Sequence, residues 1–293
     1  MLEFSISHKS ATIRYLNKAI KPKRGLSQNF LIDTEVLSII LTEANINSGD
    51  AILEIGAGDG FLTDALLRKG GKVVAVEVDP TLSARLATRH AKRDDFSLIT
   101  ADILSLKLDD IVARHPCRKW KVVANLPYHI STPILFALLS ARHLFVSMVL
   151  MFQQEFALRI TTPLGSKNKK NLSSLSVASQ WAFDVKLATL IDSESFYPKP
   201  KVDSALVTLT PKGSRIDDGG VEEEFFTLVR KFYQHRRKTI KASLKIHYPN
   251  HTSCQELFTD HLLMKKRPED LLWPDWFSLF HKLHHKSLSI NHT

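Results

Sequence analysis

Three glycines and two acids cluster between an apolar segment and a predicted helix in the first quarter of the chain. Gly56, Gly58 and Gly60 let the backbone turn sharply and approach a ligand where a Cβ atom would collide. Glu54 and Asp59 flank the turn and make it acidic. A strand-to-helix turn that binds no ligand is the alternative interpretation for such a pattern taken alone.

The acids indicate which nucleotide this turn could bind. A dinucleotide fingerprint would carry its third glycine at position 61, where the chain has Phe61. Glu77 ends the next predicted strand, about 20 residues downstream, where a carboxylate binds ribose hydroxyls. Carboxylates repel a pyrophosphate but not a cationic sulfonium nucleoside. S-adenosylmethionine therefore fits the turn better than NAD.

A tetrapeptide, Asn125-Leu-Pro-Tyr128, follows the fourth predicted strand and should share a crevice with Gly56 and Glu77. The exocyclic amine of adenine is a poor nucleophile because its lone pair is delocalised into the ring. The Asn125 side-chain oxygen and a backbone carbonyl near Leu126 could accept its two N–H groups and localise that lone pair. Tyr128 offers a face for base stacking, which is worth roughly 1–3 kcal/mol. Catalysis would then need no strong general base, only positioning and electrostatics; a proline-containing turn is the alternative.

Two further residues have both a functional and a structural interpretation. Asp102 ends the third predicted strand, where it could accept from the adenine amino group of the cofactor or cap a helix. Phe196 lies in the proline-rich segment 195–204 and could form a second stacking wall for a flipped base. Packing of this aromatic side chain in the core is the alternative.

Apolar segments alternate with helical patterns over the first 160 residues. Continuous apolar segments such as Val73–Val76 predict a mainly parallel sheet covered on both faces. The predicted strands are 51–55, 72–77, 96–100, 120–124 and 144–151, with an antiparallel edge pair at 184–191 and 204–210. The predicted helices are 33–45, 61–69, one opened by Pro80, 132–140 and 152–160. We expect an α/β fold, with a Rossmann-like sheet suited to S-adenosylmethionine followed by a small C-terminal α-helical domain.

Composition shifts suggest how the chain is divided. Residues 211–220 are rich in glycine and polar side chains, which is typical of a linker. The predicted parts are a variable extension (1–20), a Rossmann-like domain (21–211), the linker (212–220), a small helical domain (221–285) and a tail (286–293).

The composition limits the class of protein and its surroundings. A formal net charge of +10 over 293 residues favours a polyanionic partner, although membrane surfaces or solubility alone are compatible with it. Two cysteines form neither a disulfide framework nor a zinc site and indicate a reducing compartment. The first 19 residues lack the apolar core of a signal peptide and resemble an organellar transit peptide only weakly. We expect no bound metal, no membrane association and a cytoplasmic protein.

Together these motifs resemble the ribosomal RNA adenine N6-dimethyltransferases over about residues 20–285. The motifs that carry the resemblance are Gln28–Leu31, Glu54–Gly60, Glu77, Asp102-Ile103, Asn125–Tyr128 and Phe196-x-Pro-x-Pro-x-Val-x-Ser204. Segments 153–159, 232–240 and 266–271 are similar to the KsgA type, which dimethylates two adjacent adenosines in the 3′-terminal hairpin of small-subunit rRNA. The branch that modifies large-subunit rRNA in macrolide resistance resembles the chain less well after residue 210. A non-catalytic assembly or transcription factor on the same fold is a further alternative.

The resemblance implies a set of site residues. Those around S-adenosylmethionine would be Asn29, Leu31, Gly56, Glu77, Asp102 and Asn125. Those that hold the target adenine would be Asn125, Leu126, Pro127 and Tyr128, with Phe196 opposite. Phosphates would meet Arg236, Arg237, Lys238 and Lys241, unless these form a merely solvated helix face. The implied partners are small-subunit rRNA and the assembling small ribosomal subunit, bound by a monomer. One departure is the loop 161–174, which lacks the family's usual Tyr-Gly pair before Leu175-Ser-Val177.

Overall fold

The described part of the chain, in a computed structural model, comprises residues 28–284 without 116, 118, 214–218 and 250–259, together with residues 22, 23 and 25. It forms two compact units. The first holds the described residues up to Ala157 and Asp184–Pro211, and the second holds Leu158–Phe183 and those from Lys212 on. The predicted extension 1–20, the tail 286–293 and the middle of the predicted linker lie outside the described residues. The predicted domain boundaries stay a prediction.

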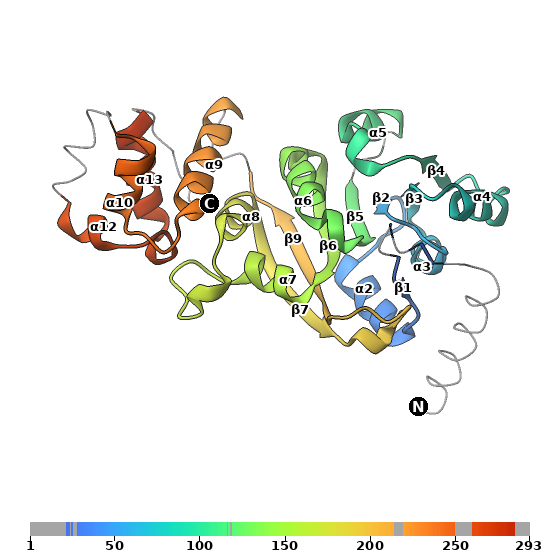
Figure 1. Ribbon diagram of the computed structural model, residues 1–293. Helices are drawn as coiled ribbons and strands as arrows, with labels where there is room; N and C mark the ends of the chain where they lie inside the picture. Colours follow the sequence, from blue (N-terminus) through green and yellow to red (C-terminus); the bar gives the residue numbers. More distant parts are fainter. Residues whose placement is uncertain are drawn as a thin grey trace. The chain divides into compact units, whose positions relative to one another are not determined.

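A seven-stranded sheet, in the order β4-β3-β2-β5-β6-β9-β7, forms the centre of the first unit (Figure 1). Its strands are β2 (Ala51–Ile55), β3 (Lys72–Glu77), β4 (Phe96–Thr100), β5 (Trp120–Asn125), β6 (Phe145–Gln153), β7 (Phe183–Ile191) and β9 (Ser204–Pro211). The pairs from β4 to β6 are parallel and β9 runs antiparallel to β6. The predicted mainly parallel sheet is therefore confirmed.

Helices lie before, between and after the parallel strands in the chain, and several bury apolar side chains against the sheet. They are α2 (Thr34–Ala44), α3 (Phe61–Arg68), α4 (Pro80–Arg89), α5 (Leu108–Arg114), α6 (Ser131–Ser140) and α7 (Gln154–Thr161). Ile40 of α2 and Leu66 of α3 share one buried cluster with Ile52 of the sheet. Asp33 and Asp79 cap α2 and α4, since each carboxylate accepts a backbone N–H of the first turn. The glycine turn is thereby set between a buried strand and a packed helix.

A second, two-stranded sheet joins the N-terminal segment to the proline-rich segment. In it β1 (Phe30–Leu31) runs antiparallel to β8 (Phe196–Tyr197), with Phe30 opposite Tyr197 and Leu31 opposite Phe196. The Ile32 N–H extends this pairing to the Ser195 carbonyl at 2.9 Å. No local sequence pattern predicts this sheet. Its pairing places Leu31, a proposed cofactor-binding residue, beside Phe196.

The second unit is helical. It contains α8 (Ser174–Ala182), α9 (Gly219–Gln234), α10 (Ile240–His247), α12 (His261–Lys265) and α13 (Trp273–His284). Trp181 of α8 packs against Phe225 of α9, with ring centroids 4.9 Å apart, and its indole N–H donates to Glu222 at 2.7 Å. The helical C-terminal region is therefore confirmed. Within the described ranges no helix has the length and apolar character needed to cross a membrane.

Candidate active site

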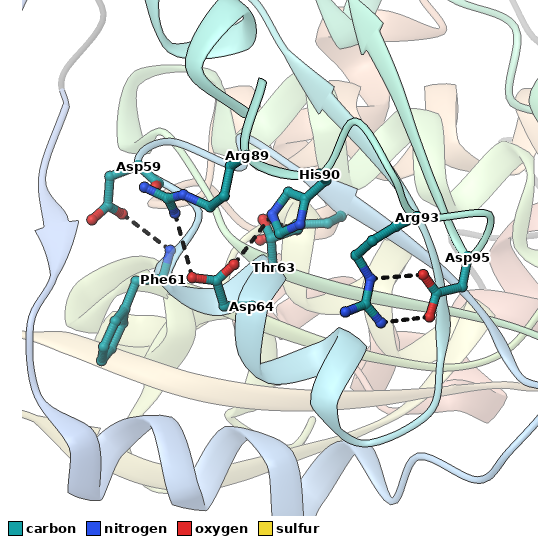
Figure 2. Close-up of polar contacts among 9 residues, drawn as sticks. Asp59, Phe61, Thr63, Asp64, Arg89, His90, Arg93 and Asp95 are labelled. Atoms are coloured by element: carbon teal, nitrogen blue, oxygen red, sulfur yellow. Dashed lines mark hydrogen bonds and ion pairs between the residues drawn. The ribbon is translucent and has the colours of Figure 1, made fainter. Parts of the chain in front are cut away.

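The glycine turn after β2 is held against α4. Gly60 has φ +88°, and a Cβ there would lie 2.6 Å from Arg89 Nη1 and 2.7 Å from Leu86 Cδ2. Figure 2 shows the Arg89 guanidinium reaching this turn, where Nη1 donates to the Asp59 carbonyl at 2.7 Å and to Asp64 Oδ2 at 3.4 Å. Any side chain at position 60 would displace these contacts, so this position requires glycine.

Glu77 is the acid that the sequence analysis placed at the end of β3, and its carboxylate is fixed by main-chain donors. Oε2 accepts the Gly58 N–H at 2.8 Å and Oε1 accepts the Asp79 N–H at 2.9 Å. Burial raises the pKa of Glu77, and these two hydrogen bonds oppose that rise. The side chain therefore stands beside the glycine turn in one orientation.

Two more carboxyl groups make the same region acidic. Glu54 is fully buried, which raises its pKa to about 8, and it accepts the Thr63 hydroxyl at 2.7 Å. Burial also raises the pKa of Asp59 to about 6, and its carboxylate accepts the Phe61 N–H at 3.3 Å (Figure 2). A bound cation would favour the charged forms of these carboxyl groups, whereas an anion would disfavour them further, so a cationic ligand suits this region better than an anionic one.

Asn125 ends β5, next to the glycine turn. Its Nδ2 donates to the Asn29 carbonyl at 3.1 Å, so the side-chain oxygen of Asn125 is directed away from Asn29. A Cβ on Gly56 would come within 3.5 Å of Pro127 Cδ, which shows how closely the tetrapeptide approaches the turn. Tyr128 hydrogen-bonds to Ser204 Oγ, and burial raises the pKa of its hydroxyl. The tyrosine ring is thereby held in place at the end of β5.

One cavity brings these residues together. The cavity is lined by β1 with the residue pair before it, by the carboxyl ends of β2, β3 and β5 with the turns that follow them, and by the first turns of α3 and α4. The lining residues are Gln28–Leu31, Glu54, Gly56–Asp59, Phe61, Leu62, Glu77, Val78, Leu82 and Asn125–Tyr128. All predicted site residues from Asn29 to Tyr128 are among them except Asp102. Gln28 and Phe30 also line the cavity and were not predicted as site residues. Their position on either side of Asn29 in the sequence is the feature that could have indicated them.

Two of the residues predicted to bind the cofactor or the target adenine do not line this cavity. Asp102 is exposed, and its Oδ1 accepts the Leu104 N–H at 2.9 Å, which makes it a cap of a short 3₁₀ turn. Phe196 is 3% exposed and belongs to the buried cluster that contains Leu31 and Ile191. Its neighbour Tyr197, which alternates to the other side of β8, is half-buried. The roles proposed for Asp102 and Phe196 stay predictions.

The predicted RNA-binding residues lie in the second unit. Arg236 is paired with Glu269, whose Oε2 accepts from Nη2 at 3.0 Å and from Nε at 3.1 Å. Arg237, Lys238 and Lys241 are exposed. Exposed cations at successive positions after α9 and at the start of α10 suit phosphate contacts, and their role stays a prediction.

The site and the sheet together define a class of protein. A mainly parallel sheet presents a glycine turn at the end of one strand and a fixed carboxylate at the end of the next, which is the arrangement that binds a nucleoside cofactor. The buried acids suit a sulfonium cation, and Gly58 leaves space that a Cβ would fill at 3.3 Å from Phe30. The fold and the site are those of a Rossmann-like, S-adenosylmethionine-dependent methyltransferase.

Comparisons with known proteins identify the family. The sequence profile described as ribosomal RNA adenine dimethylase matches residues 19–285. The chain is 42% identical over 226 residues to the ribosomal RNA small subunit methyltransferase A of Geobacter sulfurreducens, covering 77% of this chain and 81% of the relative. It is 38% identical to the protein of that name from Lactobacillus delbrueckii subsp. bulgaricus, covering 89% and 90%. The chain belongs to the ribosomal RNA adenine dimethylase family.

Solved structures agree with this assignment. A dimethyladenosine transferase from Plasmodium falciparum superposes with a TM-score of 0.71 at 29% identity, over 87% of this chain and 95% of that one. The 23S rRNA methyltransferase ErmE superposes with a TM-score of 0.62 at 26% identity, over 87% and 99%. The predicted family, fold, enzyme class, cofactor and ribosomal RNA substrate class are confirmed.

Proposed function

We propose that the protein transfers methyl groups from S-adenosylmethionine to the N6 amines of two adjacent adenosines in the 3′-terminal hairpin of small-subunit rRNA. The observation that carries this proposal is that Asn125, Tyr128 and Glu77 line one cavity beside the glycine turn. The names of the relatives from Geobacter and Lactobacillus support the small subunit as the target.

The cofactor would occupy the acidic part of the cavity. S-adenosylmethionine supplies an electrophilic methyl group on a sulfonium centre. Glu77 would accept the ribose hydroxyls, because its carboxylate is already oriented by the Gly58 and Asp79 N–H groups. The backbone at Gly56, Asn29 and Leu31 would close around the nucleoside. Asp102 would bind the adenine amino group from its cap position.

The target base would lie against the tetrapeptide at the end of β5. The Asn125 side-chain oxygen would be the acceptor, and the hydrogen bond from Nδ2 to the Asn29 carbonyl would hold the amide group in that orientation. Together with the Leu126 carbonyl it would accept the two N6–H groups and direct the nitrogen lone pair at the methyl carbon. The methylated nitrogen then releases a proton to solvent, so Tyr128 and Pro127 serve to position the base and not as a general base. Phe196 would support the stacked base from β8.

The partner would be the assembling small subunit. Arg237, Lys238 and Lys241 of the second unit would contact rRNA phosphates, and Arg236, whose charge is neutralised by Glu269, would contribute less. We also propose that the protein acts as a monomer in the cytoplasm.

The proposal is tested by mapping the product. Purified protein is incubated with undermethylated small subunits and S-adenosylmethionine, and the rRNA is digested and analysed by mass spectrometry. We expect N6,N6-dimethyladenosine at two adjacent positions in the 3′-terminal fragment. Methylation confined to other fragments, or monomethylation alone at completion, would refute the proposal.

A further inference from the structure

A groove of about 1050 Å³ opens beside the residues proposed to hold the target adenine. It shares Gln28, Asn29 and Tyr128 with the cofactor cavity. Its other walls come from the N-terminal segment at residues 22–23 and the proline-rich segment 197–202. A ligand in this groove would therefore be a direct neighbour of anything bound against Tyr128.

The walls of the groove are fixed in place. The pairing of β1 with β8 joins the N-terminal wall to Tyr197, and the Gln154 N–H binds the Asp203 carbonyl at 3.0 Å where β9 begins. On the N-terminal side, Lys23 Nζ and Gln28 Nε2 donate to the Asp79 carboxylate at 2.8 and 3.0 Å. A groove with such walls is preorganised, so a ligand binds it at a low entropic cost.

The chemistry of the groove differs from that of the cofactor cavity. None of the described residues that line the groove is an aspartate or a glutamate, whereas Glu54, Asp59 and Glu77 line the cavity. The groove instead presents Lys199, Lys201 and His129 with the rings of Tyr128 and Tyr197. Lys199 is paired with Glu194, and Lys201 is exposed. Cations combined with aromatic faces are the features that bind single-stranded nucleic acid.

Tyr197 is the aromatic residue whose ring could stack on a second base. It packs beside the buried cluster of Phe30, Ile32 and Leu82, which orients its ring, and it remains half-buried at the groove. Tyr128 is already assigned to the target adenine. A second aromatic side chain in the adjoining groove thus offers a second stacking position.

We propose that this groove binds the nucleotide next to the target adenosine, with the Tyr197 ring stacked on its base and Lys201 against its phosphate. The inference rests on the proposed function and names a second subsite for the same RNA. The ligand is a single-stranded nucleotide, because a paired base would not present a free face to Tyr197.

The test is a double-mutant cycle that combines protein variants with RNA variants. The substrate is an RNA hairpin with a target adenosine in its loop, intact or with an abasic ribose on either side of the target. For the wild type, we expect the abasic site on one side to lower kcat/KM by about 5- to 150-fold, the range expected for loss of one stacked base. Tyr197→Leu should lower kcat/KM on intact RNA by a similar factor and should lose sensitivity to that abasic site. Tyr197→Phe keeps the ring and should retain the sensitivity.

The phosphate contact has its own readout. Lys201→Gln should lower the slope of log affinity against log salt by about 0.7, the value for one contact to a single strand. Lys92→Gln, an exposed lysine outside the groove, is the matched control and should leave the slope unchanged. Cofactor affinity, measured by calorimetry, should stay the same in all these variants.

The outcomes separate this inference from the proposed function. Wild-type methyl transfer that is insensitive to both abasic sites, or a Tyr197→Leu variant that keeps the wild-type sensitivity, would overturn the subsite while the proposed function stands. A wild type that methylates no RNA would overturn both.

Discussion

The side-chain amide nitrogen of Asn125 donates to the main-chain carbonyl of Asn29 at 3.1 Å, although 96 positions separate the two residues in the chain. This bond links the end of β5 to the N-terminal segment that carries β1. It also orients the amide group, so that the side-chain oxygen, which is its acceptor atom, is directed away from the Asn29 carbonyl. One hydrogen bond thus joins the proposed cofactor-binding segment to the proposed target-base segment.

Asn125→Ala should abolish methyl transfer while largely sparing RNA binding. We expect kcat to fall by at least about 100-fold, because an acceptor positioned for the transition state is lost. Single-turnover methylation and a filter-binding assay measure the two effects separately. Asn168→Ala, outside the cavity, is the matched control. Turnover within tenfold of the wild type would refute the role assigned to Asn125.

Glu77→Ala should weaken cofactor binding by about 1–3 kcal/mol, the cost of deleting a charged hydrogen-bond partner. The Gly58 and Asp79 N–H groups would also lose their acceptor, which loosens the glycine turn. Calorimetry with S-adenosylmethionine gives the affinity, and Asp94→Ala, an exposed acid outside the cavity, is the control. Unchanged affinity would count against the ribose-binding role.

Asp79 should act as a positioning residue for the N-terminal segment. Burial alone would raise the pKa of Asp79, but hydrogen bonds from Lys23, Gln28 and the Thr81 N–H outweigh it and lower the pKa. Asp79→Asn keeps a good helix cap but loses the charge that holds Lys23. We expect faster hydrogen exchange in β1 and a cofactor affinity lower by about 1 kcal/mol.

A double-mutant cycle checks this coupling. Lys23→Met and Asp79→Asn share one interaction, so their effects on cofactor affinity should not add. Arg93→Met and Asp95→Asn, which break an exposed pair away from the cavity, form the control cycle. Additive effects of the Lys23 and Asp79 substitutions would show that the segment is held by other contacts.

Glu54 should make the stability of the protein fall as the pH rises. Its pKa is about 8 in the folded protein against 4.5 ordinarily, so the folded state keeps a proton that the unfolded state releases. The stabilisation linked to this proton is complete below about pH 4.5 and is lost as the pH rises through about 8. Glu54→Gln, which retains an acceptor for Thr63, should be more stable than the wild type at pH 9 by on the order of 2 kcal/mol or more. Urea unfolding at pH 6 and pH 9 measures this, and an equal pH dependence in both proteins would contradict it.

The basic residues after α9 should contribute unequally to RNA affinity. Arg237→Gln combined with Lys238→Gln should lower the slope of log affinity against log salt by about 1.5 to 2. Arg236→Gln should change it less, because Glu269 already neutralises that guanidinium. Titrations with small-subunit rRNA at several salt concentrations provide the slopes. If Arg236→Gln changed the slope by about half as much as the double substitution, Arg236 would contribute as much as Arg237 or Lys238. That result would mean that the Arg236–Glu269 ion pair opens on RNA binding.

The sequence predicted those parts of the fold that depend on local pattern. Continuous apolar segments such as 73–76 predict buried parallel strands because every side chain there faces a covered side. Glycines and acids at strand ends predicted a nucleoside site because ligands bind at the carboxyl ends of parallel strands. The helix α8 was missed, since its serines follow a polar loop and its burial depends on Phe225, far away in the chain.

Long-range partners explain what the sequence left open in the site. The β1–β8 pairing involves two residues on each side, too few to produce a periodic pattern, and it decides that Tyr197 and not Phe196 reaches the groove. Likewise, Arg236 belongs to a basic run by sequence, but Glu269 neutralises it in the folded chain. Such pairings depend on tertiary contacts that no local signal records.

Both the proposed activity and its substrate are measured by transfer of labelled methyl groups from S-adenosylmethionine to three substrates in parallel. These are undermethylated small subunits, naked small-subunit rRNA and large-subunit rRNA. We predict label only in small-subunit material, released as N6,N6-dimethyladenosine, and the preferred of the two forms identifies the assembly state of the substrate. Label on large-subunit rRNA, or no label while the cofactor still binds, would contradict the proposed methylation of small-subunit rRNA.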